Sequence, residues 1–356
     1  DFYLFGWPTR PAWLYALTEG LHVTLGLALF PVVLAKLWSV IPRLFEWPPV
    51  RGPVHALERA SLALLVGGAL FEFVTGILNI QYWYAFPFFF IQAHYYGAWI
   101  FIGAFLAHVT LKVGTMRRSL RTRGVVLDAQ APSGVDPAGA DVLEAPLAAP
   151  APAPATMSRR VLLGTVGAGS LLLFVQGAAQ SLGGPFRSLA FLLPRGRSGS
   201  GPLGFPVNKT WVASGIPSRA VGASWSLELV GRRSVSLSRE QLLKLPQHTY
   251  ELPIACVEGW STTQRWTGVR LRELAAIGGI AGMATVTTES FDHGTFGKAT
   301  LGHEQVSDER SLLALKVNGV DLSLDHGYPA RVISPAVPGV HCTKWVARMS
   351  FQAVAE

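Results

Sequence analysis

Four long apolar segments constrain this chain more than any other feature of its sequence. Each has about twenty residues or more, the length that crosses the hydrocarbon core of a bilayer as an α-helix. Half of the residues, 50%, are hydrophobic and only 15% are charged, a balance too apolar for one soluble domain. The sequence therefore predicts four membrane-spanning helices, at residues 14–40, 56–80, 92–116 and 161–183.

Basic residues are distributed unevenly among the connecting segments. Loop 41–59 and the stretch after the third span contain several Lys and Arg residues, whereas loop 81–91 contains none. Because cytoplasmic loops are enriched in Lys and Arg, we expect both basic segments to be cytoplasmic and the N-terminus and loop 81–91 to lie outside. The net charge of +8 has the same explanation, so nucleic-acid binding is not expected. A chain that begins outside also predicts a further upstream span in the natural protein.

Composition suggests five parts. Residues 1–120 form a helix bundle, and residues 121–157, rich in Ala, Pro, Gly and Asp, are expected to be a disordered cytoplasmic linker. Residues 158–184 contain the fourth span, and residues 185–204 are a Gly- and Pro-rich tether. In residues 205–356, short strand-like runs alternate with helical ones, which is typical of an α+β domain. We predict strands at 224–230, 234–237 and 284–288, a capping box at Ser238 that opens a helix, and another helix from Arg270.

The fourth span begins at Ser158-Arg159-Arg160, directly before an apolar run. This arrangement is similar to a twin-arginine export signal. Cytoplasmic anchoring by any pair of arginines explains it equally well. In either case the fourth span leaves the cytoplasm, so the C-terminal domain is expected outside a bacterial-type cytoplasmic membrane.

Histidines lie at matched depths in the predicted spans. His94 and His108 are fourteen residues apart on the third span, which is about 3.9 turns and roughly 21 Å of rise, so they share one face. His22 lies at the depth of His94 and His55 lies near that of His108. The pattern resembles the membrane-anchoring b-type cytochromes of respiratory oxidoreductases, which implies one or two b haems held by His22 with His94 and by His55 with His108. Structural hydrogen bonding or proton relay is the alternative.

Two separated blocks in the C-terminal part carry a second resemblance. The first is Ala255-Cys256-Val257-Glu258-Gly259-Trp260, and the second runs from Asp325-His326-Gly327 through Arg331 to Cys342-Thr343-Lys344-Trp345. Together they resemble the sulfite-oxidase-like molybdopterin domain, in the branch that includes the catalytic subunit of the periplasmic methionine sulfoxide reductase. The resemblance covers roughly residues 203–356 and agrees with an α+β fold. A buried structural cysteine is the alternative for Cys256 taken alone.

The resemblance implies a role for each matching residue. The Cys256 thiolate would bind molybdenum, a soft ligand for a metal that also takes the pterin dithiolene, and Arg331 and Lys344 would neutralise the pterin phosphate. Further cofactor contacts are implied at Asn208, Lys209, Ser290, His326, Cys342 and Thr343. The chain departs from true sulfite oxidases after the cysteine, where they have a small residue, Asn and paired arginines that help to bind an anion. Its pocket is therefore expected to be less specific for anions.

These observations predict a membrane-anchored molybdopterin-dependent oxidoreductase. It would transfer an oxygen atom to or from a small substrate outside the membrane and exchange electrons with quinone, or another membrane carrier, through haem b. Reduction of a substrate such as a sulfoxide is the favoured direction. A sulfite-type dehydrogenase is the first alternative, and a cofactor-free binding or structural subunit of a membrane electron-transfer complex is the second. Membership of a larger respiratory complex is left open.

Overall fold

The computed structural model describes residues 6–45, 47, 50–126, 157–195, 199–294 and 297–354. The chain divides into two compact units. The first combines Asp1–Leu27 with Leu172–Glu356, and the second comprises Ala28–Leu171. Residues 127–156, which make up most of the predicted linker, lie outside the described residues.

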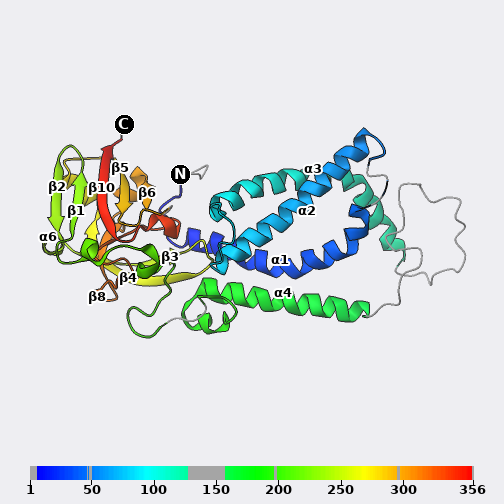
Figure 1. Ribbon diagram of the computed structural model, residues 1–356, viewed down its shortest axis with the longest axis horizontal. Coiled ribbons are helices and arrows are strands. Elements are labelled where there is room, and N and C mark those ends of the chain that lie inside the picture. Colours follow the sequence, from blue (N-terminus) through cyan, green and yellow to red (C-terminus); the bar gives the residue numbers. More distant parts are fainter. Residues whose placement is uncertain are drawn as a thin grey trace, which may run out of the picture. The chain divides into compact units, whose positions relative to one another are not determined.

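Each predicted apolar segment is a helix (Figure 1). All of these helices are long and apolar enough to cross a membrane. Pro53 occupies the first turn of the second helix, where its missing N–H leaves no hydrogen bond unmade. The third helix continues beyond the predicted boundary at residue 120. Their bounds are α1 Leu14–Leu44, α2 Pro53–Ile80, α3 Phe90–Val126 and α4 Arg159–Leu182.

In the second unit, α2 and α3 lie side by side over most of α2. Glycines permit the close approach: a Cβ added to Gly68 would lie 3.3 Å from the Cβ of Phe101, and one added to Gly97 would collide with Phe71 and Glu72. Small residues at helix contacts let backbones approach in this way. Side chains of α2 and α3 are therefore brought within hydrogen-bonding distance.

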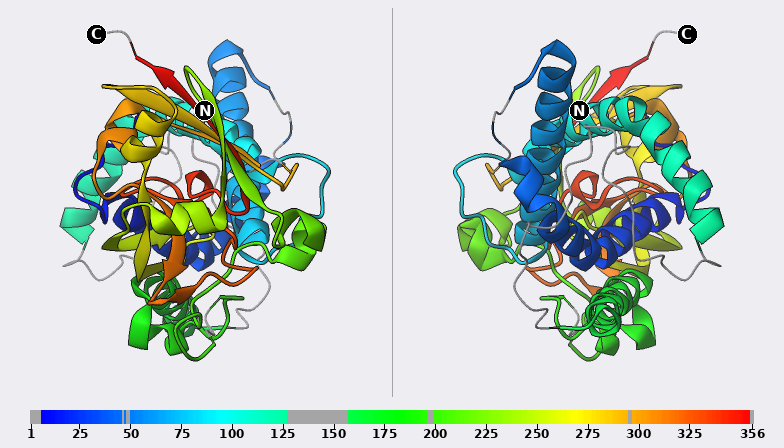
Figure 2. Two further views of the ribbon diagram at one scale, coloured as in Figure 1. Left: turned by 90° about the vertical axis from the view of Figure 1, so that its left-hand side faces the viewer. Right: turned by 90° about the vertical axis from the view of Figure 1, so that its right-hand side faces the viewer.

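The first unit contains two sheets. In the first sheet the strand order is β2-β1-β10-β5-β6. β10, the red strand that leads to the C-terminus in Figures 1 and 2, runs parallel to β1 and antiparallel to β5. The bounds are β1 Ser226–Val230, β2 Ser234–Ser238, β5 Ala284–Ser290, β6 Lys298–Leu301 and β10 Val346–Ala353.

The second sheet carries the hairpin that contains the cysteine motif. Its order is β3-β4-β7-β8, and β9 pairs with β7. β3 and β4 are antiparallel, with Ala255 opposite Ser261, so the residues between them form a short loop at one end of the sheet. The bounds are β3 His248–Ala255, β4 Ser261–Arg270, β7 Leu312–Val317, β8 Val320–Asp321 and β9 Arg331–Ile333.

The short helices have local sequence causes. Ser238 accepts a hydrogen bond from the Gln241 N–H, and the Gln241 side chain accepts one from the Ser238 N–H, so the predicted capping box is confirmed. The predicted strands and the helix after Arg270 are also present. The remaining helices are α5 Trp211–Ser214, α6 Arg239–Lys244, α7 Leu271–Ile277 and α8 His303–Ser307, with 3-10 turns at Gly184–Leu189, Ser218–Val221 and Gly339–His341.

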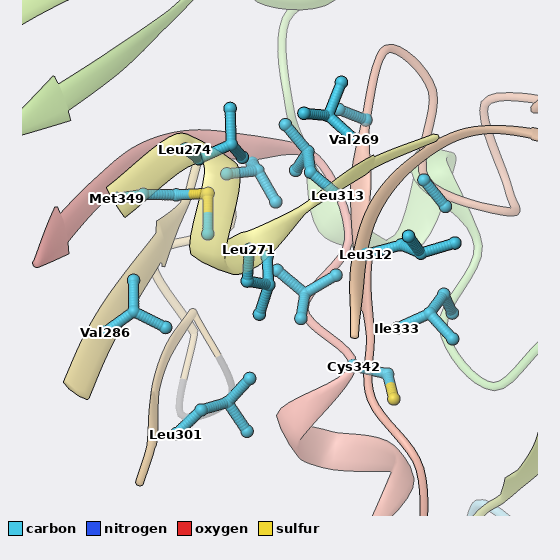
Figure 3. Close-up of a cluster of buried hydrophobic side chains, with 14 of the residues drawn as sticks. Val269, Leu271, Leu274, Val286, Leu301, Leu312, Leu313, Ile333, Cys342 and Met349 are labelled. Carbon is cyan, nitrogen blue, oxygen red and sulfur yellow. The ribbon is translucent and has the colours of Figure 1, made fainter. Parts of the chain in front are cut away.

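A single large apolar cluster joins the two sheets (Figure 3). Leu271 and Leu274 of α7 pack with Leu312 and Leu313 of β7 and with Met349 of β10, and all of them are fully buried. Burial alternates along β5, as expected for a strand with one face on the core. This core fixes the ends of β3, β4 and β9, where the candidate site lies.

Candidate functional site

Cys256 lies in the loop that joins β3 to β4. Its N–H donates to the carbonyl of Trp260 and its carbonyl accepts from the N–H of Gly259, both at 2.9 Å. These bonds close the loop into a tight turn. Gly339 packs directly on it, since a Cβ there would lie 2.6 Å from the carbonyl oxygen of Ala255. The Cys256 side chain is therefore held in one place, and the residue is only 3% exposed.

A pocket opens beside this cysteine. The space between its lining residues amounts to about 330 Å³, a figure that includes open solvent at the pocket mouth. Apolar side chains form part of its wall and polar groups converge on the rest. The lining residues are Phe205, Pro206, Val207, Asn208, Ile254, Cys256, Trp260, Asp325, His326, Arg331, Gly339 and Lys344.

Two of the lining residues are buried cations. Arg331 is 7% exposed and Lys344 is 8% exposed. Arg331 donates to the carbonyl oxygens of His326, at 3.1 Å, and Cys342, at 3.2 Å, and its Nε is buried without a hydrogen-bond partner among the described residues. Neither cation forms an ion pair with a carboxylate within the part of the chain that the structure describes. Because a buried charge is stable only when it is compensated, this pair is suited to binding an anion.

Aromatic rings and backbone carbonyls offset part of this charge. The Arg331 guanidinium lies 5.2 Å from the centre of the Trp266 ring, and the Lys344 ammonium lies 4.4 Å from that of Trp345. Burial is the main cause that lowers the pKa of Arg331 to about 10 and that of Lys344 to about 7. Arg331 contributes further to the low pKa of Lys344. The negative charge of a bound anion would raise the pKa of both groups.

His326 is neutral at physiological pH. Burial, followed by the charge of Arg331, lowers its pKa to about 4. Its ring lies 3.9 Å from the ring of Phe205, centre to centre, and its Nδ1 is 2.8 Å from Ser323 Oγ. Its Nε2 lies 3.3 Å from the carbonyl oxygen of Phe205. Both nitrogens of this neutral imidazole therefore have a partner in the domain, and the ring adds no third positive charge to the pocket.

The Cys256 thiol is protonated at neutral pH in the absence of a metal ion. Burial, followed by the negative charge of Glu258, raises its pKa well above the ordinary value. A metal ligand must be the thiolate, and a bound metal ion removes the proton itself. Among the described residues, no group of three or more His, Cys, Asp or Glu side chains is placed to hold a metal ion. The Cys256 side chain lines the pocket, so it is a candidate sulfur ligand for a metal ion bound there.

Four predicted cofactor contacts lie outside the pocket lining. The Lys209 ammonium binds both oxygens of Asp292, at 2.9 and 2.7 Å, whereas its carbonyl accepts a hydrogen bond from Lys344. Ser290 Oγ donates to the carbonyl of Lys344 at 2.7 Å. Lys209 and Ser290 thus form hydrogen bonds with Lys344 from outside the pocket lining.

Cys342 and Thr343 lie between the core and the site. Cys342 is part of the apolar cluster (Figure 3), and burial raises the pKa of its thiol. Thr343 is 3% exposed, and its hydroxyl oxygen has no hydrogen-bond partner among the described residues. The sequence blocks did not single out Phe205, Ile254 and Asp325 as site residues, although Phe205 directly precedes the segment that contains Asn208.

Comparisons with known proteins agree with this geometry. Residues 213–356 match the family described as "Oxidoreductase molybdopterin binding domain". The C-terminal region is a molybdopterin-binding oxidoreductase domain. This domain is 32% identical over 150 residues to the mitochondrial sulfite oxidase of Mus musculus, a match that covers 35% of this chain and 28% of that protein. The chain thus spans less than a third of the sulfite oxidases that it matches.

Two further matches are to bacterial proteins. The "Uncharacterized oxidoreductase YuiH" of Bacillus subtilis is 29% identical over 150 residues, which cover 41% of this chain and 73% of that protein. The solved structure of the sulfane dehydrogenase SoxCD from Paracoccus pantotrophus is 25% identical and aligns over 36% of this chain and 38% of that one, with a TM-score of 0.34.

The residues of this molybdopterin-binding domain fit the cofactor that its family name implies. A buried thiol faces the same pocket as two buried cations that lack a carboxylate partner, and one guanidinium nitrogen has no hydrogen-bond partner among the described residues. A phosphate-bearing pterin that carries a metal supplies both the anion and the cation that these groups need. The structure brings Cys256, Arg331 and Lys344 to one pocket, and their contact with a cofactor stays a prediction.

The predicted haem ligands fall in both units. His94 of α3 has its Nδ1 2.9 Å from Thr75 Oγ1 and 3.1 Å from Glu72 Oε2, both on α2. His55 Nδ1 accepts a hydrogen bond from the Arg51 N–H at 3.0 Å. His108 lies half-buried on α3, and His22 is exposed on the part of α1 that belongs to the first unit.

Proposed function

We propose that the chain is a membrane-anchored molybdenum oxidoreductase that reduces a small oxidised substrate, such as a sulfoxide, with electrons from quinol. The observation that carries this proposal is the pocket that the Cys256 thiol shares with the buried cations Arg331 and Lys344, neither of which is paired with a carboxylate among the described residues. Four helices that are able to cross a membrane provide the anchor. The placement of the domain outside the membrane follows from the basic loops of the sequence.

When bound, the molybdenum cofactor supplies two-electron oxygen-atom transfer. The chain's own residues hold it and shape its surroundings. Cys256 contributes the sulfur ligand, and Arg331 and Lys344 neutralise the phosphate. Neutral His326 would contact the pterin, with its two ring nitrogens held by Ser323 and Phe205. Phe205, Ile254 and Trp260 line the pocket with apolar surface, which keeps water from the reacting centre and strengthens the electrostatic contacts there.

Haem b is proposed as the electron carrier in the membrane part, with His22 paired to His94 and His55 paired to His108. The contact of Glu72 and Thr75 with His94 supports this assignment. A histidine that ligates a metal commonly binds a carboxylate or another polar group through its second ring nitrogen, which fixes the ring orientation and raises its basicity. Glu72 is therefore interpreted as a positioning residue for His94.

The second candidate function reverses the flow of electrons. The mitochondrial sulfite oxidase of Mus musculus and its relatives match this domain at about a third identity, which favours oxidation of sulfite or a similar compound. The sequence after the cysteine, Val257-Glu258-Gly259-Trp260, has a buried acid and lacks the paired arginines that help true sulfite oxidases to bind an anion. This residue choice favours the reductase.

The decisive experiment combines metal analysis with optical spectroscopy on the full chain, expressed with molybdenum available. We expect molybdenum and a b-type haem spectrum in the same protein. In the reductase, methionine sulfoxide added to dithionite-reduced protein reoxidises the haem. In the dehydrogenase, sulfite added to oxidised protein reduces it. Protein that contains neither metal would support the cofactor-free binding or structural subunit instead.

A further inference from the structure

The Cys256 loop packs against the first helix within the first unit. A Cβ added to Gly259 would lie 2.6 Å from Cγ1 of Val23, so the bare Cα of Gly259 rests on the Val23 side chain. Gly259 also has a φ of 85°, in the left-handed region that glycine adopts without strain. Val23 is 8% exposed, whereas Leu25 on the same helix is 49% exposed. Helix α1 thus turns Val23 toward the cysteine loop.

The fourth helix, α4, is hydrogen-bonded to the same loop. Gln180 Nε2 donates to the carbonyl oxygen of Glu258 at 2.8 Å, and Gln180 is 1% exposed. Ser261, the first residue of β4, donates from Oγ to the carbonyl oxygen of Ser181. Arg187 Nη2 donates to the carbonyl oxygen of Ser261 at 2.5 Å. Both sides of the loop are therefore tied to α4 and the turn that follows it.

The two helices are also packed together at this level. A Cβ added to Gly177 of α4 would lie 2.9 Å from the Cα of Thr24, the residue after Val23. Thr24 is 4% exposed. The contact between α1 and the cysteine loop is therefore supported from both sides by buried groups, and buried packing of this kind resists displacement.

This arrangement leaves a short path between two predicted metal ligands. The carbonyl of Cys256 accepts a hydrogen bond from the N–H of Gly259 at 2.9 Å, Gly259 touches Val23, and Val23 is bonded to His22 in the chain. One hydrogen bond and one van der Waals contact are the noncovalent steps between the Cys256 residue and the His22 backbone. The side chain on this path is that of Val23, which is buried.

We propose that the contact between Gly259 and Val23 is the route by which electrons pass between a metal bound at Cys256 and a haem bound at His22. This inference rests on the proposed function and adds the route to it. A quinol supplies two electrons and two protons and leaves as quinone. Each electron crosses singly, so that ferrous iron is oxidised as the molybdenum is reduced. Two crossings remove the oxygen of one sulfoxide as water and leave the thioether.

The test uses full-length protein loaded with both metals and reduced with duroquinol, a membrane-soluble quinol. Haem reduction is followed by absorbance, and arrival of the electron at molybdenum by freeze-quench electron paramagnetic resonance of the pentavalent metal. Val23→Ala opens a gap at the contact, and Gln180→Leu releases the loop from α4. The matched control is Leu25→Ala, which shortens an exposed side chain on the same helix.

We expect Val23→Ala and Gln180→Leu to slow arrival of the electron at molybdenum several-fold, with unchanged haem reduction and unchanged content of both metals. Leu25→Ala should behave as the unaltered protein. Wild-type transfer rates in both contact variants would overturn the route and leave the proposed function standing. Failure of the proposed function gives a different result, because the unaltered protein would then lack either the haem absorbance or the paramagnetic resonance signal of molybdenum.

Discussion

The Lys344 ammonium donates a hydrogen bond of 2.9 Å to the carbonyl oxygen of Asp325, and both residues line the candidate cofactor pocket. The carbonyl of Lys209 accepts a second bond from the same ammonium. Carbonyl dipoles only partly replace the water that burial removes, so the pKa of Lys344 is lowered to about 7. The pocket without its ligand therefore holds a cation whose charge is poorly compensated.

This relationship predicts that anion binding weakens as the pH rises through about 7. The folded pKa of Lys344 lies below the ordinary value of 10.5, so its charge destabilises the ligand-free domain below pH 7. That cost falls as the pH rises from about 7 toward 10.5. Sulfate, which keeps its charge throughout this range, binds the protonated form better.

Thermal unfolding of cofactor-free protein with and without sulfate measures this effect. Stabilisation by sulfate should be larger about one unit below pH 7 than about one unit above it. Lys344→Met should remove the difference, whereas Lys298→Met, at an exposed lysine paired with Glu289 on the first sheet, should preserve it. Equal stabilisation at both pH values in the unaltered protein would show that Lys344 does not control anion binding.

Replacing Cys256 with Ser should abolish turnover and leave haem content unchanged. The serine hydroxyl fills nearly the same space in the loop, but it is a hard and weakly acidic ligand in place of a soft sulfur. Activity with methionine sulfoxide and the optical haem spectrum report on the two outcomes. Cys342→Ser is the matched control, because Cys342 lies in the apolar cluster and outside the pocket lining. Normal turnover in Cys256→Ser would remove this residue as the ligand.

Replacing His94 with Ala should remove one b-type absorbance component and leave molybdenum bound. The imidazole would be lost from α3, whereas the pocket of the first unit would keep all of its residues. Visible spectra and metal analysis of the same preparation measure both quantities. Unchanged haem content would refute His94 as a ligand.

Replacing Glu72 with Gln should change the midpoint potential of the haem at His94 without removing the haem. The amide keeps a polar partner 3.1 Å from His94 Nδ1 but removes the carboxylate, which favours ferric iron when it is ionised. We expect the haem to be retained and its midpoint potential to rise, as measured by redox titration of the optical spectrum. A potential equal to that of the unaltered protein would show that Glu72 does not act through His94.

Shortening a side chain of the apolar core should lower the stability of the domain that carries the site. Leu271 is fully buried between the two sheets, so Leu271→Ala should lower the free energy of unfolding by about 2–5 kcal/mol. Met283, at 38% exposure, is the control, and Met283→Ala should change it by less than ~0.5 kcal/mol. Denaturant unfolding in detergent, followed by tryptophan fluorescence, compares the two variants. Similar destabilisation by both would contradict this account of the core.

Local sequence patterns predicted the four long helices and several of the short elements correctly, because the forces that form them act over a few residues. The apolar runs produced α1 to α4, and the Ser238 and Gln241 capping box opened α6. The two motif blocks indicated Cys256, Arg331 and Lys344, and the structure gathers them around one pocket. The haem pairing, the quinone and the orientation across a membrane stay predictions.

The sequence by itself thus determined which elements form and which residue types carry the chemistry. Only the tertiary structure decided which of these side chains meet. Asp292 forms an ion pair with Lys209, Glu72 contacts the imidazole of His94, and Gly259 packs against Val23. Such contacts join residues far apart in the chain, and they depend on how whole helices and sheets pack. Periodicity and motifs describe single segments, so they specify the face of an element but not its partner.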